Sequence, residues 1–359
     1  MFRMLGQLGP AVRNRRRTMV PIAVPLAVVI VVLLAAVLTG NAGAADSRLA
    51  PVVTTVSSEA DGPEVVTVGA YINDIQSLDL RNYTYRVDFY LWLKWDDPEF
   101  DPALTLGQVN PFNYHDSVEK VLYDEPIQLE DGQYYTAIRY LGEFSTKMPL
   151  ADFPFDDQVL SIKLEDESYD SSGVVYVPDK EPVVLDKHLL LPGYNIMQPT
   201  MHIEDFVYDS TFGFEGAAAS SYSRITIDVP VSRPWFTNLM KVLLPVLLVA
   251  AVAAMVFFLD PTYVDARLGM GITAMLTLVA LQFTTAADLP QTEYLMMLDV
   301  LYIIAYGYVM LVLASVVATS QLAKKGQEDA ALALDKKLMV LTTLVYVGAL
   351  ALTFWFFLR

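Results

Sequence analysis

The chain has 359 residues, no cysteine and a formal net charge of −17, with 54% hydrophobic and 18% charged residues. This composition excludes a disordered chain and a fold held together by disulfides. The acidity also argues against nucleic acid as a partner, because phosphates are bound by Lys and Arg, and it favours cations.

The charged residues are sorted into blocks along the chain. Residues 1–45 hold five Arg and no acidic residue, residues 46–233 hold 33 Asp and Glu against 12 Lys and Arg, and residues 234–359 hold 8 against 7. A strongly acidic, polar middle region therefore precedes an apolar and nearly neutral C-terminal third.

Residues 1–45 have the pattern of a secretory signal peptide. Arginines at 13 and 15–17 precede an apolar run over 20–38, and small residues follow at 41–45. A basic start, an apolar middle and a small-residue end are typical of such peptides. The apolar run is long for this class, so an uncleaved anchor is the alternative. Both predict that residues 46–232 form an extracellular or periplasmic domain.

The exported region shows the alternation of strands. From residue 65 to 228 the hydrophobic period is mostly two, with clear strands at 85–95, 134–144 and 159–164 and a hairpin over 201–231. Pro, Gly and Asp separate these segments. Many short strands with such turns predict an all-β sandwich.

The region 233–359 contains four apolar stretches, at about 235–259, 266–287, 294–319 and 337–358. Each is long enough to cross a hydrocarbon core of about 30 Å as a helix. Lysines between the third and fourth stretches predict that this loop is cytoplasmic; they are Lys324, Lys325, Lys336 and Lys337. We therefore predict a multi-pass protein of the cell inner (plasma) membrane, in contact with membrane lipids.

The second stretch carries a row of small, hydroxyl and apolar residues on one helical face. The row comprises Gly269, Thr273, Leu276, Ala280, Phe283 and Ala287. Asp265 stands at its inner end. Several copies side by side would line a pore with an apolar constriction and a ring of carboxylates that selects cations. The alternative is that the small residues only pack on a neighbouring helix.

Several motifs in order along residues 60–359 resemble the pentameric ligand-gated ion channels, the Cys-loop receptor superfamily. They are Trp-Asp-Asp-Pro at 95–98, Phe-Pro-Phe-Asp-Asp-Gln at 153–158, Arg-Pro at 233–234, Pro245, the segment 266–273 and Leu-Pro at 289–290. The two cysteines that name the superfamily are missing, as in its bacterial members. The chain is similar to such a bacterial member.

The resemblance implies a homopentamer in which each subunit contributes a β-sandwich and four helices, with the second helix lining a central pore. It places Asp265 at the intracellular mouth and Leu276 at the central gate, with the remainder of the row above and below the gate. Anion-conducting members usually have Pro where this chain has Asp265, although the rest of the helix looks like the anion-selective type. We expect monovalent cations to permeate.

The resemblance also implies an agonist site between adjacent sandwiches, built from aromatic side chains that hold a cation. The matching residues are Tyr208, Phe212 and Tyr222, with Tyr90 from the neighbouring copy. Glu167 stands where amine-gated members have Trp. The acids Glu165, Asp166 and Glu167 are a solvated loop, a site for a small ammonium compound or Ca²⁺, or a proton sensor.

At the junction of the two domains the resemblance implies an acid–arginine pair, Asp156 and Arg233, with Phe155 and Pro290 in the coupling loops. The sequence has no nucleophile, phosphate-binding or zinc motif, and its three histidines are far apart. We therefore predict no enzyme and no cofactor beyond modulation by Ca²⁺. The alternative function is a membrane-anchored oligomeric sensor or binding protein that does not conduct ions.

Overall fold

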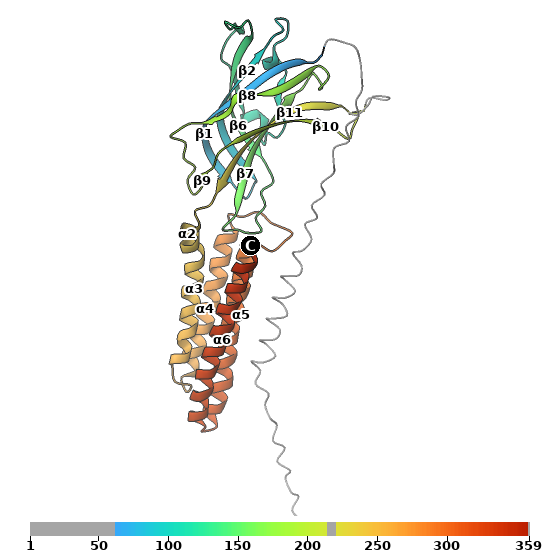
Figure 1. Cartoon of the computed structure of the whole chain (residues 1–359). Coiled ribbons are helices and arrows are strands. Elements are labelled where there is room, and N and C mark those ends of the chain that lie inside the picture. Colours follow the sequence, from blue (N-terminus) through green and yellow to red (C-terminus); the bar gives the residue numbers. More distant parts are fainter. Residues whose placement is uncertain (1–61, 214–219, 358–359) are drawn as a thin grey trace, which may run out of the picture.

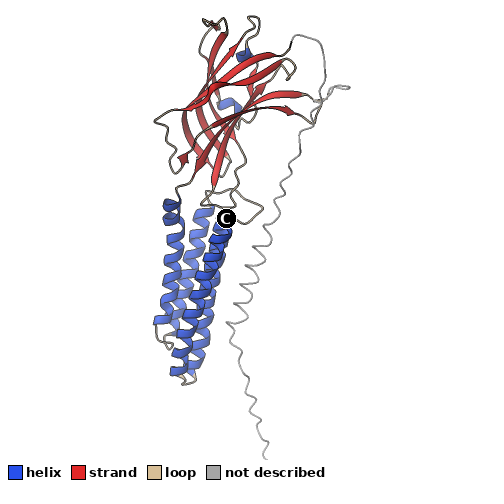
Figure 2. Cartoon of the chain, in the orientation of Figure 1, coloured by secondary structure: helices blue, strands red, loops and turns tan. Residues whose placement is uncertain are grey.

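The computed structural model describes residues 62–213 and 220–357. The predicted signal peptide at 1–45 lies outside these residues. Strands gather in one part of the molecule and long helices in the other (Figures 1 and 2). The predicted β-sandwich followed by four apolar helices is therefore confirmed.

The β domain consists of two sheets. In the first sheet the strand order is β4-β6-β2-β1-β8, with β5 beside β6. Its strands are β1 (Glu64–Asp79), β2 (Thr84–Trp95), β4 (Val118–Val121), β5 (Ile127–Gln128), β6 (Tyr134–Ser145) and β8 (Val174–Leu185). All pairs in this sheet are antiparallel except β1 with β8.

The second sheet has the order β10-β11-β7-β3, with β9 beside β11, and all its pairs are antiparallel. Its strands are β3 (Leu106–Gln108), β7 (Asp157–Asp166), β9 (Asn195–Ile196), β10 (Thr200–Val207) and β11 (Ser221–Ser232). Two short 3-10 helices, η1 (Pro102–Leu104) and η2 (Tyr114–Asp116), lie in the connections.

Alternate residues of the strands fill the space between the sheets, as period two requires. In the centre, the Phe89 ring stacks on Tyr140 with 5.1 Å between centroids and lies 6.1 Å from Phe144. All three rings are fully buried. Since the chain has no cysteine, apolar packing replaces any disulfide in holding the sheets together.

The helical part has four helices that are long and apolar enough to cross a membrane. The first span, Trp235–Phe258, consists of α2 (Trp235–Asn238), the π-helical turn η3 (Leu239–Leu243), α3 (Leu244–Ala254) and η4 (Met255–Phe258). The others are α4 (Val264–Ala286), α5 (Met297–Lys324) and α6 (Glu328–Phe357). Pro245 has no N–H to donate, and the irregular turn η3 directly precedes it.

The third and fourth helices are longer than their apolar stretches. α5 continues to Lys324 and α6 already begins at Glu328. Hydropathy marks where a helix meets lipid, whereas the helix itself continues through polar residues. Residues 325–327 make the turn, and Gly326 has a φ of 76°, a conformation in which a side chain would be strained.

The helices are unequally covered. In the most apolar stretch of each helix, 61% of the residues are buried in α5, but only 22% in α4 and 17% in α6. α5 is therefore the centre of the subunit, and α4 and α6 each keep a face without a partner in the single chain.

The loop between β6 and β7 joins the two parts by backbone hydrogen bonds. The N–H of Met297 donates to the carbonyl of Ala151 at 2.7 Å, and the N–H of Leu298 donates to that of Phe153 at 3.2 Å. The hydroxyl of Tyr294 accepts from the N–H of Leu150 at 3.0 Å. The start of α5 is thus fixed directly to the β domain.

We expect Phe89→Ala to destabilise the β domain by about 3–5 kcal/mol, because it leaves a cavity against Tyr140 and Phe144. Urea unfolding followed by tryptophan fluorescence measures this loss. Leu190→Ala is the control, since that side chain is 82% exposed, and it should stay within about 0.5 kcal/mol of the wild type. Equal losses in both variants would contradict this core.

Candidate functional site

Among residues 62–213 and 220–357, nothing packs on one face of α4, and it is the face that carries the predicted row. Every member of the row is exposed, namely Asp265, Gly269, Thr273, Leu276, Ala280, Phe283 and Ala287. Leu276 is 64% and Phe283 74% exposed. The opposite face is buried, and it comprises Arg267, Gly271, Ala274 and Leu278. All seven predicted residues thus lie on one exposed face of α4, and their place in a pore stays a prediction.

The two glycines of α4 show the difference between its faces. A Cβ on Gly271 would lie 2.4 Å from the Leu313 side chain of α5, so the two helices pack closely only because this residue is small. A Cβ on Gly269 would meet nothing within 4 Å. The small residue on the free face therefore serves no packing inside the subunit.

The threonine hydroxyls of α4 donate to their own helix. Thr273 donates to the carbonyl of Gly269 and Thr277 to that of Thr273, both at 2.8 Å, and Thr284 donates to Ala280 at 2.9 Å. The hydroxyl proton is used within the helix, so the oxygen presents lone pairs outward. Such oxygens suit partly hydrated cations.

The second predicted feature, a cluster of aromatic side chains, is present at the edge of the second sheet. The Tyr208 ring lies 5.2 Å from Phe212 and 5.7 Å from Tyr222, between centroids. Tyr90 lies on the other sheet, with the Arg139 guanidinium 5.3 Å from its ring. Three of the four aromatic residues therefore come together within one chain.

Sequence reasoning missed the residue that fills this cluster, Arg224 on β11. Its guanidinium carbon lies 3.5 Å from the centroid of Phe206 and 5.5 Å from that of Tyr208. Its Nη2 donates to Glu165 at 2.9 Å and to the Tyr208 hydroxyl at 2.7 Å, and this hydroxyl donates to Glu165 at 2.5 Å. A cation of the chain itself thus covers the aromatic faces. Spacing along the chain does not indicate this pair, since only the register of β11 on β7 places Arg224 opposite Glu165.

The acids at 165–167 have three different surroundings. Glu165 binds Arg224. Asp166 is buried and accepts from the Thr105 hydroxyl at 2.6 Å and from two backbone N–H groups at 2.8 Å. Glu167 lies against Gly107, where any Cβ would overlap its carboxylate. Among residues 62–213 and 220–357, no three His, Asp or Glu side chains converge to hold a metal ion. The three acids therefore do not form one Ca²⁺ site, and Glu167 is not the acid that contacts Tyr208.

Glu167 instead shares its surroundings with Glu119 of β4, which pairs with Tyr140 of β6. Glu119 is exposed at the surface, but neighbouring atoms of the β domain remove part of its water, which raises its pKa. The charge of Glu167 raises this pKa further, while the Tyr140 hydroxyl partly opposes both effects. Glu119 therefore takes up a proton more readily than an ordinary glutamate.

At the junction, the predicted pair is formed. Nε of Arg233 donates to Asp156 at 2.9 Å, and both side chains are largely buried. The guanidinium carbon of Arg233 lies 4.9 Å from the Phe153 ring and 4.6 Å from the Tyr194 ring. Gln158 donates to the other oxygen of Asp156 at 2.5 Å.

The predicted coupling loops meet the helices nearby. The Phe155 ring lies 6.0 Å from Phe354 of α6, and Pro290 is half-buried in the loop between α4 and α5. The β domain thus contacts the beginning of the first span, the outer end of α4 and the last helix.

Comparison with known proteins agrees with this architecture. Residues 242–344 match the family model of the neurotransmitter-gated ion-channel transmembrane region. The chain is 26% identical over 283 residues to the glycine receptor subunit beta of Rattus norvegicus, covering 71% of this chain and 55% of the relative. It is 23% identical over 318 residues to the proton-gated ion channel of Gloeobacter violaceus, covering 83% and 85%. It is also 22% identical over 272 residues to the pH-sensitive chloride channel 2 of Anopheles gambiae, covering 69% and 44%.

The chain is similar to members of the pentameric ligand-gated ion channel family, and the family-model match lies in its transmembrane region. It is a multi-pass membrane protein with four candidate spans after the β domain. The match spans about half the length of the animal relatives and most of the bacterial one. The names of these relatives include both a chloride channel and a proton-gated channel, so the similarity alone does not decide which ions a channel of this kind would conduct.

The raised pKa of Glu119 predicts a pH-dependent stability difference. A carboxyl with a raised pKa contributes stability that is complete below its ordinary pKa and is lost as the pH rises through the raised value. Glu119→Gln should therefore melt at a higher temperature than the wild type at neutral pH, and the difference should vanish below the ordinary glutamate range.

Asp186→Asn is the control of opposite sign, because the hydrogen bond from Tyr71 lowers the pKa of Asp186. Asp186→Asn should melt lower than the wild type at neutral pH, and this difference should also vanish in acid. A pH-independent gain in Glu119→Gln would contradict the raised pKa.

Proposed function

We propose that the protein is a cation-selective channel of the cell inner (plasma) membrane, a homopentamer whose pore is lined by α4 of each subunit. The observation that carries this proposal is the free face of α4, where seven residues on one helical row are exposed together. An aspartate, threonine hydroxyls and large apolar groups share this face, which suits a water-filled path with a constriction better than contact with lipid alone.

The apolar part of the row supplies the gate. Leu276 and Phe283 are the two large, exposed apolar side chains of the row. Rings of such side chains around a narrow axis exclude water and so stop ions. Opening then requires the five α4 helices to tilt or rotate so that these rings move apart.

Asp265 supplies the cation preference. It lies exposed in the first turn of α4, while the neighbouring Arg267 is buried on the opposite face. Two unit charges about 4 Å apart at an effective dielectric of about 20 interact by about 4 kcal/mol. A ring of aspartates at the inner mouth therefore attracts monovalent cations and repels anions.

The effector acts on the β domain, which we place outside the cell. An ammonium ligand at the aromatic cluster has to displace the guanidinium of Arg224, which already contacts Phe206, Tyr208 and Glu165. A proton needs no such displacement, and the pair Glu119 and Glu167 offers a carboxylate that takes up protons readily. We therefore favour a proton as the effector over an amine or a divalent cation. The name of the proton-gated bacterial relative supports this choice.

The Asp156–Arg233 pair transmits the change. It joins the loop that holds the start of α5 to the residue that precedes the first span. A buried, hydrogen-bonded charge pair moves as a unit, because breaking it leaves a charge unpaired. The β domain and the helices are thus obliged to shift together.

Reconstitution of the full chain in liposomes tests the proposal. Acidification of the outer solution should produce a sodium flux, and a parallel screen of amines and Ca²⁺ at neutral pH should produce less. If no stimulus produces a flux while the protein is inserted and oligomeric, the non-conducting sensor is the better description.

Asp265→Ala should shift the reversal potential in a tenfold NaCl gradient toward the chloride equilibrium potential, because it removes the ring of carboxylates. Asp288→Ala is the matched control, since Asp288 is equally exposed but lies beyond the outer end of α4. An unchanged reversal potential in Asp265→Ala would mean that another group selects the ions.

Asp156→Arg should abolish the response to the effector, because it places two guanidinium groups at the junction. The exchange Asp156→Arg with Arg233→Asp should recover a measurable part of the response. Currents divided by surface biotinylation measure both. A single variant with the wild-type response would show that the pair plays no part in coupling.

A further inference from the structure

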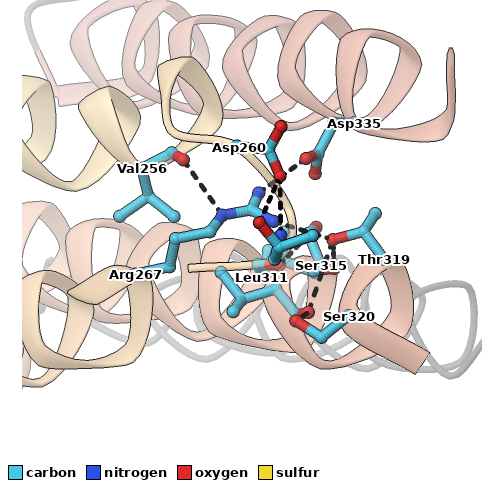
Figure 3. Close-up of polar contacts among 10 residues, drawn as sticks. Val256, Asp260, Arg267, Leu311, Ser315, Thr319, Ser320 and Asp335 are labelled. Carbon is cyan, nitrogen blue, oxygen red and sulfur yellow. Dashed lines mark hydrogen bonds and ion pairs between the residues drawn. The ribbon is translucent and has the colours of Figure 1, made fainter. Parts of the chain in front are cut away.

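A fully buried charge lies behind the inner end of α4. Arg267 is 0% exposed, and Figure 3 shows its guanidinium enclosed between helices. Nε donates to the carbonyl of Val256 at 3.1 Å, Nη1 to the hydroxyl of Thr319 at 3.1 Å, and Nη2 to Asp335 at 2.7 Å. These three partners belong to the first span, α5 and α6, so one side chain of α4 contacts every other helix of the subunit.

Asp335 is the counter-ion in this network. It is 3% exposed, and one of its two carboxylate oxygens has no hydrogen-bond partner among the described residues. The serines nearby, Ser315 and Ser320, donate to carbonyls of their own helix. An ionised group in such surroundings is tolerated only beside an opposite charge. The 2.7 Å contact makes Arg267 and Asp335 an almost neutral unit.

The position of Arg267 relative to Asp265 along α4 connects the Arg267–Asp335 pair with ion selection. Asp265 and Arg267 are two residues apart, which is about 200° around an α-helix. Asp265 therefore lies on the free face while Arg267 points away from it, but both stand at the same level of the membrane. A charge in a region of low dielectric is screened weakly, so an unpaired Arg267 would oppose Asp265 across the width of one helix.

We propose that Asp335, on the last helix and away from the free face of α4, is a selectivity-determining residue. It cancels the charge of Arg267, so that the exposed acids near the inner end of α4, Asp265 and Asp260, set the sign of the potential at the inner mouth. This inference rests on the proposed function as a cation channel. Asp265, Arg267 and Asp335 together carry a net charge of −1 per subunit, which becomes 0 without the charge of Asp335.

A merely structural role predicts a different outcome. α6 buries little of its surface in the subunit, so the ion pair also anchors this helix. Loss of an anchor lowers the amount or stability of the channel, but it does not change the ratio of cation to anion permeability. The charge balance does change this ratio, in a direction that depends on which partner is neutralised.

The experiment measures reversal potentials of full-length channels in a tenfold NaCl gradient, with surface expression recorded separately. Asp335→Asn should lower the ratio of sodium to chloride permeability by about tenfold or more. The double variant Arg267→Gln with Asp335→Asn restores the net charge of −1 and should regain the wild-type ratio. Asp335→Glu keeps the charge and should also behave as the wild type.

A second comparison covers the case in which Asp335→Asn does not fold. Arg267→Gln alone leaves a net charge of −2 per subunit and should be more cation-selective than the double variant. Equal ratios in these two variants, or a wild-type ratio in Asp335→Asn, would overturn the proposal. A wild-type channel that conducts chloride, or conducts nothing, would instead overturn the proposed function, so the two failures are distinguishable.

Discussion

The packing of α4 is the constraint on which the rest of this molecule depends. This helix has to be held firmly on one side and left free on the other. The close approach to α5 at Gly271 and the buried contacts of Arg267 supply the firm side. The free side then carries Asp265, the threonines and the exposed Leu276 and Phe283. A subunit built in this way is incomplete by itself, because large apolar groups and a carboxylate share a surface that neither lipid nor water alone suits.

Two arginines near the proposed ligand site and the proposed pore are neutralised by acidic side chains of the same chain. Arg224 lies over Phe206 and Tyr208 and binds Glu165, as a bound amine would do in an aromatic box. Arg267 is paired with Asp335 in the same manner. Acidic groups outside these pairs include Asp265 on α4, and Glu119 and Glu167 in the β domain. The cation preference and the proton response proposed here follow from these acidic groups.

The β domain and the helices are joined by the chain itself and by side-chain contacts. Arg233 immediately precedes the first span, and its partner Asp156 lies in the loop whose backbone binds the start of α5. The guanidinium of Arg233 contacts the rings of Phe153 and Tyr194, and Asp156 is buried. Neither part of the chain can therefore move here without breaking these contacts. In the proposed channel, the same few side chains would transmit a change in the β domain to the first and third spans.

The sequence by itself determined the order of the parts, the strand periods, the four spans and which residues of α4 share a face, because hydrophobic period and length depend only on residues near one another in the chain. The junction pair and the aromatic residues followed from a resemblance. Only the tertiary structure decided which charges meet. Glu165 rather than Glu167 contacts Tyr208, Arg224 fills the aromatic cluster, and Asp335 neutralises Arg267. These partners are 43, 59 and 68 residues apart, and buried charges choose partners by distance in space, about which spacing along the chain carries no information.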